Sequence, residues 1–260
     1  MHARSALFDL YGDHLRARGG EAPVAALVAL LTPLGISPPA VRTAVSRMVK
    51  QNWLTATVLH GQRGYALTRK GRQRLDETAA RIYRTRDPRW EGTLDLVMFR
   101  PPTERSRRAR LGDALRFHGY GPLSPGTWIS PWHSTELEDV FVEAEVSFDR
   151  FTSRHHGDTL ALTRRAWDLD ALARRYREFV ATMEPVVNLV GTGTGDELAY
   201  TVRCELVHAF RVFLFSDPQL PGALCPPEWA GSTAAAFFDA QAARLRPAAD
   251  RFVDRCLNLR

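Results

Sequence analysis

Residues 37–54 of the chain read SPPAVRTAVSRMVKQNWL, and this stretch decides which fold the sequence predicts. Ser37 fits a helix N-cap and the two prolines after it fit a first helical turn, so we expect a helix from residue 37 to about residue 53. At about 100° per residue, apolar and polar side chains fall on opposite arcs of this helix. The apolar arc holds Val41, Ala44, Val45, Met48 and Val49, and the polar arc holds Arg42, Thr43, Ser46, Arg47 and Lys50.

The polar arc of this helix combines cations with short hydroxyl side chains and contains no acid. Arginine can read guanine through two hydrogen bonds, serine and threonine can reach bases or phosphates, and lysine neutralises phosphate. A face that is only solvated more often mixes glutamate with lysine. The pattern therefore favours a helix that binds double-stranded DNA, with a solvated surface as the alternative.

The segments on either side of this helix complete a winged helix-turn-helix. We expect helices at residues 5–18 and 22–34, strands at residues 55–59 and 65–67, and a helix at residues 69–86 capped by Thr68. The two strands form a hairpin whose tip, residues 60–64, is bracketed by glycines. Arg63 at this tip is predicted to contact a phosphate or the minor groove, and a solvated turn residue is the alternative.

The rest of the chain predicts two further domains. Residues 89–165 fit a ferredoxin-like α+β domain, and residues 166–260 fit a mostly helical domain. The middle domain is expected to hold strands at residues 94–99, 127–129 and 146–152, a basic helix to about residue 118, a turn-rich loop at 119–126 and a helix at 136–143. The C-terminal helices are expected at residues 167–183, 198–215 and 232–257, with Pro247 as a kink or break. The fold class is therefore multi-domain α+β, with the winged helix-turn-helix occupying residues 1–88.

Positive charge is concentrated in the first third of the chain. Residues 1–90 contain 15 Lys and Arg against 6 Asp and Glu, whereas residues 91–260 contain 20 against 23. The net charge of +6 therefore comes entirely from the N-terminal segment. Such asymmetry implies a polyanionic partner for that segment, and DNA is the usual one.

Several function classes are disfavoured by what the sequence lacks. It shows neither an apolar run long enough for a membrane span nor a signal-peptide layout, so a cytoplasmic protein is expected. Cys204, Cys225 and Cys256 have no CxxC spacing, so no disulfide framework or zinc site is indicated. His155 and His156 are adjacent and fit a loop better than a metal site. We expect no metal, no cofactor and no enzyme activity.

Two groups of polar residues are candidates for binding an effector. Arg105 and Arg108 belong to the basic helix of the middle domain, where arginine suits phosphate geometry. A solvated surface, contact with DNA, and pairing across an interface with Glu136, Glu138 and Asp139 are the alternatives. His208 and Arg211 lie on an otherwise apolar helix and need partners if they are buried. A structural network with the loop around Trp229 is the first interpretation for this pair, and effector binding is the second.

Short motifs occur in a specific order and spacing along the whole chain. In the N-terminal part they include Leu10-Tyr11-Gly12-Asp13, Val41-Arg42-Thr43-Ala44-Val45-Ser46-Arg47-Met48 and Asn52-Trp53-Leu54. In the rest of the chain they include Trp90-Glu91-Gly92, Thr127-Trp128-Ile129-Ser130-Pro131, Leu206-Val207-His208-Ala209-Phe210-Arg211, Asp217-Pro218-Gln219-Leu220-Pro221 and Pro226-Pro227-Glu228-Trp229-Ala230-Gly231. Together these motifs resemble one family, the PaaX transcriptional regulators, and the resemblance implies a homodimer on a two-fold symmetric operator. It also implies a repressor that an acyl-CoA effector, such as phenylacetyl-CoA, releases from DNA.

The resemblance also bears on an enzymatic alternative. The middle domain of this family is similar to small CRISPR-adaptation nucleases, which place an aspartate at the end of the first strand. Here Arg100 stands at that position and Asp95 lies inside the strand. Arginine cannot bind the metal that the aspartate would bind, so a dimerisation role is favoured over nuclease activity. A nuclease, a CoA-ester-acting enzyme and a DNA-binding protein without an effector remain the alternatives.

Overall fold

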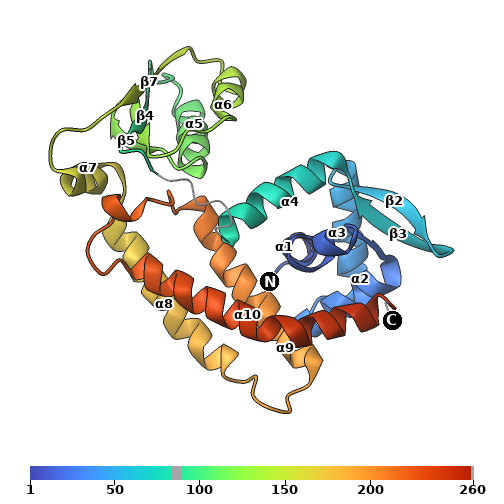
Figure 1. The fold of residues 1–260 in the computed structure, drawn as a ribbon. Helices are drawn as coiled ribbons and strands as arrows, with labels where there is room; N and C mark the ends of the chain where they lie inside the picture. The colour runs from blue at the N-terminus through green and yellow to red at the C-terminus, as the bar shows by residue number, and fades with distance from the viewer. Residues whose placement is uncertain (84–89, 259–260) are drawn as a thin grey trace. The chain divides into compact units, whose positions relative to one another are not determined.

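The computed structural model describes residues 1–83 and 90–258, apart from the side chains of Glu77, Ala80, Arg81 and Phe215 (Figure 1). The chain forms two compact units. One takes Met1–Arg86, Phe179–Arg211 and Ala234–Arg260, and the other takes Asp87–Glu178 and Val212–Thr233. The C-terminal helices are therefore shared between the two units.

The first unit contains the predicted winged helix-turn-helix. Its elements are α1 (Ala3–Leu10), continued by helical turns to Arg18, β1 (Glu21–Pro23), α2 (Val24–Leu31), α3 (Pro38–Lys50), β2 (Leu54–Leu59), β3 (Gln62–Leu67) and α4 (Arg69–Ile82). The three strands form one antiparallel sheet in the order β1-β3-β2. Figure 1 shows the hairpin β2–β3 projecting from the helices α1, α2 and α3.

Strand β1 lies where the sequence predicted the start of a helix. Gly19 and Gly20 both have positive φ and turn the chain, so the next three residues pair with β3 before α2 begins. Close packing makes this pairing depend on Gly64, because a Cβ there would lie 2.7 Å from the Ala22 carbonyl oxygen. The strand was missed because it is short and includes Pro23, which normally weakens a strand prediction.

Local backbone chemistry sets both ends of α3. At its C-terminus Asn52 has φ of 59°, and the Trp53 and Asn52 amides donate to the Met48 and Val49 carbonyls at 2.9 Å. This is a Schellman motif, with asparagine in the left-handed position. At the N-terminus Ser37 occupies the cap position, but its side chain accepts no capping hydrogen bond. Pro39 at the second helical position has no amide to donate, so only the Ala40 amide at the third position is left as a capping donor.

The core of the first unit includes C-terminal residues as well as the winged helix. Leu7, Tyr11 and Leu30 are fully buried in one cluster with Tyr200 and Val253. These last two residues belong to α9 (Asp196–Arg211) and α10 (Ala230–Cys256). Helix α10 continues through Pro247, so the alternative of a break there is wrong. Buried residues on both sides of the proline, Leu245 and Ala249 among them, hold the helix in place.

The second unit contains the predicted ferredoxin-like domain. Its elements are β4 (Leu94–Phe99), α5 (Arg105–Phe117), β5 (Gly121–Ser124), β6 (Thr127–Ser130), α6 (Leu137–Glu143), β7 (Phe148–Ser153) and α7 (Thr159–Ala166), followed by α8 (Leu169–Val187). The sheet is antiparallel in the order β5-β6-β4-β7, which is the ferredoxin-like arrangement. Strand β5 lies in the segment predicted as a loop, because its glycine and proline give a weak strand signal.

No single helix in the described part of the chain is long and apolar enough to cross a membrane. Residues 24–34 and 38–50 pass that test only when taken together, and they are bent by 119°.

Candidate nucleic-acid interface

Helix α3 has the two faces that its sequence predicts. Val41, Ala44, Val45 and Met48 are buried. The five predicted DNA-binding residues of the helix, Arg42, Thr43, Ser46, Arg47 and Lys50, are all exposed. Val49 is the exception, because 37% of its surface is exposed although it was assigned to the buried arc. At about 100° per residue it falls closer to Arg42 than to Val45, so it lies at the edge of the apolar arc.

The cations of this face form no ion pair within the described part of the chain. Arg42, Arg47 and Lys50 make no ion pair or side-chain hydrogen bond with any other residue that the structure describes. An exposed cation on a folded surface gains little from an ion pair, but an array of them attracts a polyanion. The face of α3 therefore presents uncompensated positive charge together with the hydroxyls of Thr43 and Ser46.

The hairpin β2–β3 differs from its prediction in one respect. Its turn consists of His60 and Gly61 alone, and both have positive φ, as a tight two-residue hairpin requires. Arg63 is not at the tip, because it lies within β3 opposite Val58. Both side chains are exposed and point to the same side of the hairpin. Arg63 keeps an outward position beside the tip without being part of the turn.

Aromatic contacts fix the C-terminal end of α3 to its neighbours. The rings of Phe8 and Trp53 meet edge to face at 5.0 Å, so α1 holds the turn that follows α3. Lys70 lies 5.5 Å above the Trp53 ring, and the Thr68 hydroxyl donates to the Asn52 carbonyl at 2.7 Å. Thr68 also caps α4 as predicted, accepting from the Gly71 amide at 3.0 Å. These contacts hold the C-terminal end of α3 against α1 and the start of α4.

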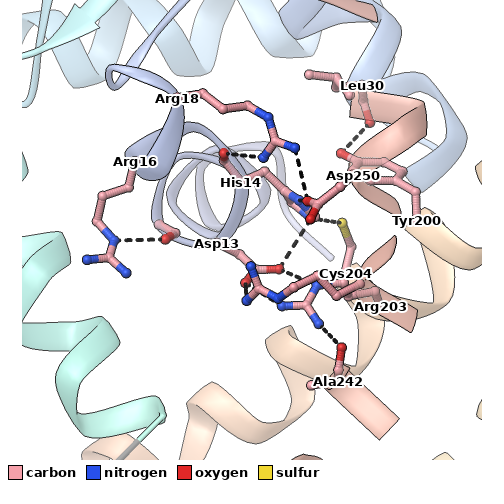
Figure 2. A network of polar contacts seen from close by, with 12 residues as sticks. Asp13, His14, Arg16, Arg18, Leu30, Tyr200, Arg203, Cys204, Ala242 and Asp250 are labelled. Atoms are coloured by element: carbon pink, nitrogen blue, oxygen red, sulfur yellow. Dashed lines mark hydrogen bonds and ion pairs between the residues drawn. The ribbon is translucent and has the colours of Figure 1, made fainter. Parts of the chain in front are cut away.

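A buried ion pair connects the winged helix to the C-terminal helices (Figure 2). Arg203 on α9 donates to both Asp13 carboxylate oxygens, at 2.9 and 2.7 Å, and its guanidinium also donates to the Ala242 carbonyl. The Tyr83 hydroxyl donates to the same carboxylate. Burial opposes ionisation of Asp13, but the charges of His14 and Arg203 outweigh it and lower its pKa. The pair is therefore charged on both sides and fully enclosed.

A second set of contacts surrounds His14, beside this pair. His14 lies 3.3 Å from Asp13 and 3.8 Å from Asp250, and Arg18 lies 3.1 Å from Asp250 (Figure 2). The His14 contact lowers the pKa of Asp250 to about 2, against the opposing effect of burial and with help from Arg18. Burial raises the pKa of the Cys204 thiol, so this cysteine is a neutral, inert core residue.

His208 and Arg211 are partly buried and pair with a different residue from the one predicted. His208 Nδ1 lies 2.7 Å from one Asp9 carboxylate oxygen, and Arg211 Nε lies 2.9 Å from the other. Asp9 is on α1, so the expected network with the Trp229 loop is wrong. Trp229 instead packs edge to face on Tyr176 in the second unit. The sequence could not show this partner, because Asp9 and His208 are 199 residues apart.

Arg105 and Arg108 lie on the exposed side of α5. Arg105 has no ion-pair or hydrogen-bond partner among the described residues, and Arg108 donates to the Pro102 carbonyl at 3.4 Å. The acids expected as alternative partners have other neighbours, because Glu138 pairs with Arg150 and Glu136 lies 3.8 Å from His118. Both arginines therefore keep their positive charge at the surface of the second unit.

Asp95, the acid inside the first strand of the ferredoxin-like domain, is hydrogen-bonded by side chains of the same domain. Arg150 donates to it from Nε at 3.0 and 3.1 Å, and the Tyr120 hydroxyl donates to it as well. Arg100 is exposed and follows the end of β4. No group of three or more His, Cys, Asp or Glu residues in the described part of the chain is arranged to hold a metal ion.

Comparisons with known proteins match three successive segments of the chain to models of one family. Residues 2–71 match the family described as PaaX-like protein, residues 87–161 match the PaaX protein central Cas2-like domain, and residues 167–255 match the PaaX-like protein C-terminal domain. The chain is 33% identical over 263 residues to the transcriptional repressor PaaX of Escherichia coli (strain K12), covering 96% of this chain and 82% of that protein.

A solved structure of an uncharacterised protein from Mycobacterium tuberculosis has the same fold. The TM-score is 0.66 at 22% identity, with 96% of this chain and 98% of that chain covered. At this identity the likeness concerns the fold alone. The family matches and the repressor similarity lead to one conclusion, as the motifs of the sequence predicted: this chain is a member of the PaaX family.

Proposed function

We propose that this chain is a transcriptional repressor that binds operator DNA through α3 and the hairpin β2–β3. The exposed face of α3 carries the proposal, since it joins uncompensated cations to hydroxyl side chains above a buried apolar face. Arg42 and Arg47 would read base edges, and Lys50 and Arg63 would contact phosphates. The name of the 33% identical relative, a transcriptional repressor, supports this function. The protein would act in the cytoplasm, without catalysing a reaction.

The repressor is proposed to act as a homodimer. Two winged helices related by a two-fold axis would place their α3 helices in successive major grooves, about one helical turn apart. The division into domains at residues 1–88, 89–165 and 166–260 belongs to the same proposal. It is supported by the three matched segments, which lie close to these ranges. The ferredoxin-like domain would supply the dimer contact.

Release from DNA is proposed to follow the binding of an acyl-CoA. Phenylacetyl-CoA is the proposed ligand, and phenylacetate catabolism is the pathway that the repressor would regulate. Arg105 and Arg108 are exposed cations suited to the phosphates of such a ligand. His208 and Arg211 are the other candidates, and an anionic group on the effector would compete with Asp9 for them. Release requires that the effector prefer an arrangement of the dimer that does not fit the operator.

The test is DNA binding by the purified full chain. A duplex enriched by the protein from a random library would be labelled and titrated, first alone and then with phenylacetyl-CoA, with free CoA as the matched control. We expect specific binding that the CoA ester weakens at least tenfold and free CoA does not. Absence of any enriched sequence would contradict the repressor. Equal affinity with and without the ester would contradict this effector while leaving the repressor intact.

A further inference from the structure

We propose that Val49 reads the methyl group of a thymine in the major groove. The inference rests on the DNA-binding function proposed above and adds a determinant of sequence preference to it. Val49 lies in the last turn of α3 and is 37% exposed, whereas Val41 and Val45 on the same helix are 0% and 3% exposed. The described part of the protein therefore leaves more than a third of this apolar residue exposed on the helix proposed to face DNA.

The neighbours of Val49 place it on the binding face. Residues three and seven positions apart lie on one side of a helix, so Val49 continues the exposed line of Arg42 and Ser46. Lys50 follows it in sequence and is exposed too. If Arg42 and Ser46 enter the major groove, Val49 enters with them. The uncompensated charge around it favours DNA over a protein partner, because no described carboxylate is paired with Arg42 or Lys50.

The chemistry of the groove selects the base. The major-groove edges of the four bases present hydrogen-bond donors and acceptors, and thymine alone adds a methyl group. A valine side chain has two methyl groups and can form no hydrogen bond, so the thymine methyl is the contact that it can gain from. Valine is also stiff in a helix, with one strongly preferred rotamer, so little side-chain freedom is lost on binding.

A second exposed valine provides the matched control. Val142 on α6 is 75% exposed, more than Val49, but its helix carries Glu138, Asp139 and Glu143. This acidic surface repels DNA, so truncating Val142 removes the same two methyl groups from a place where no base can lie. A difference between V49A and V142A therefore reports position and not the loss of a valine in general.

The experiment removes the methyl group from either side of the contact. Each thymine of the enriched duplex is replaced in turn by deoxyuridine, which lacks only that methyl. For the unchanged protein we expect one position in each half-site where deoxyuridine weakens binding about fourfold, as for one buried methyl group. V49A changes both subunits of the proposed dimer, so it should bind the thymine duplex about fifteenfold more weakly, about fourfold for each half-site, and show no further loss with deoxyuridine. V142A should behave like the unchanged protein.

The outcomes separate this inference from the function on which it rests. Full sensitivity of V49A to deoxyuridine, or indifference of the unchanged protein at every position, overturns the role of Val49 and leaves a sequence-specific repressor. Failure to enrich any duplex overturns both. V49T keeps the shape of the side chain and replaces one methyl by a hydroxyl, so it guards against misfolding. It should melt as the unchanged protein does and lose part of the deoxyuridine effect.

Discussion

The first unit holds two groups of cations in opposite environments. Arg42 and Arg47 on α3 are exposed and have no carboxylate partner in the described structure, whereas the Arg203 side chain is 1% exposed and bonded to Asp13. A cation in water costs the fold nothing and is available to a ligand. A cation taken out of water must be fully paired, or it destabilises the protein. Changes at the exposed group should therefore alter DNA binding, and changes at the buried group should alter folding.

Replacing Arg203 by methionine should have the largest effect. Asp13 would then be buried as a charge without its main partner, at a cost of about 3–5 kcal/mol of unfolding free energy. Urea titration followed by circular dichroism would measure this loss. R251A is the control, because Arg251 pairs with Asp196 at the surface and should contribute little to stability. Equal losses for R203M and R251A would remove the distinction between buried and exposed pairs.

A double variant sharpens the same point. D13N/R203M removes both charges, so it should recover a large part of the stability that R203M loses. The amide of asparagine can still accept the hydrogen bond from the Tyr83 hydroxyl. A double variant as unstable as R203M alone would mean that the arginine stabilises the fold through packing, and that its charge is secondary.

Replacing Arg47 by alanine should give the next largest effect, on binding alone. The loss of a base contact costs about 1–3 kcal/mol, or about 5- to 150-fold in affinity, for each half-site of the enriched duplex, with the unfolding free energy unchanged. R110A is the control, since Arg110 is an exposed arginine of α5 in the second unit. Unchanged operator affinity of R47A in a shift assay would exclude Arg47 from the residues that read DNA.

How far the sequence could predict these two groups depends on the distance along the chain. The two faces of α3 are encoded within thirteen consecutive positions. Helical periodicity is therefore enough to separate the buried residues from the exposed ones. The prediction that Val49 is buried was wrong, because the burial of a residue at the edge of an apolar arc depends on which neighbours pack against it. The Asp13–Arg203 pair joins positions 190 residues apart, and a single sequence holds no record of such a pairing. The one nearby sequence feature that pointed to this pair was the position of Arg203 among the apolar residues of α9.

The acid response of the fold should depend on Asp250. Its pKa of about 2 lies below the ordinary 3.8, so the ionised carboxylate stabilises the folded state. This stabilisation is complete above the ordinary pKa and is lost as the pH falls through about 2. D250N should therefore lower the unfolding free energy by about 1–2 kcal/mol near neutral pH, and the difference should shrink between about pH 4 and pH 2. Urea titrations of both proteins across this range would measure it. A constant difference would mean that the stabilisation by Asp250 does not depend on its charge.

The smallest effect is expected at Arg63, and it tests whether all exposed cations of the first unit act alike. Arg63 lies beside the hairpin tip, and we expect it to contact phosphate, whereas Arg47 is expected to reach a base. R63A should weaken binding a few-fold on every duplex, without changing which duplex is preferred. It should also reduce the slope of log affinity against log salt concentration by about 1 for each subunit of the proposed dimer. Titrations of the enriched duplex and a scrambled duplex at several salt concentrations give both quantities. A changed order of preference would assign Arg63 to base reading in the minor groove, and an unchanged slope would place the hairpin away from the DNA.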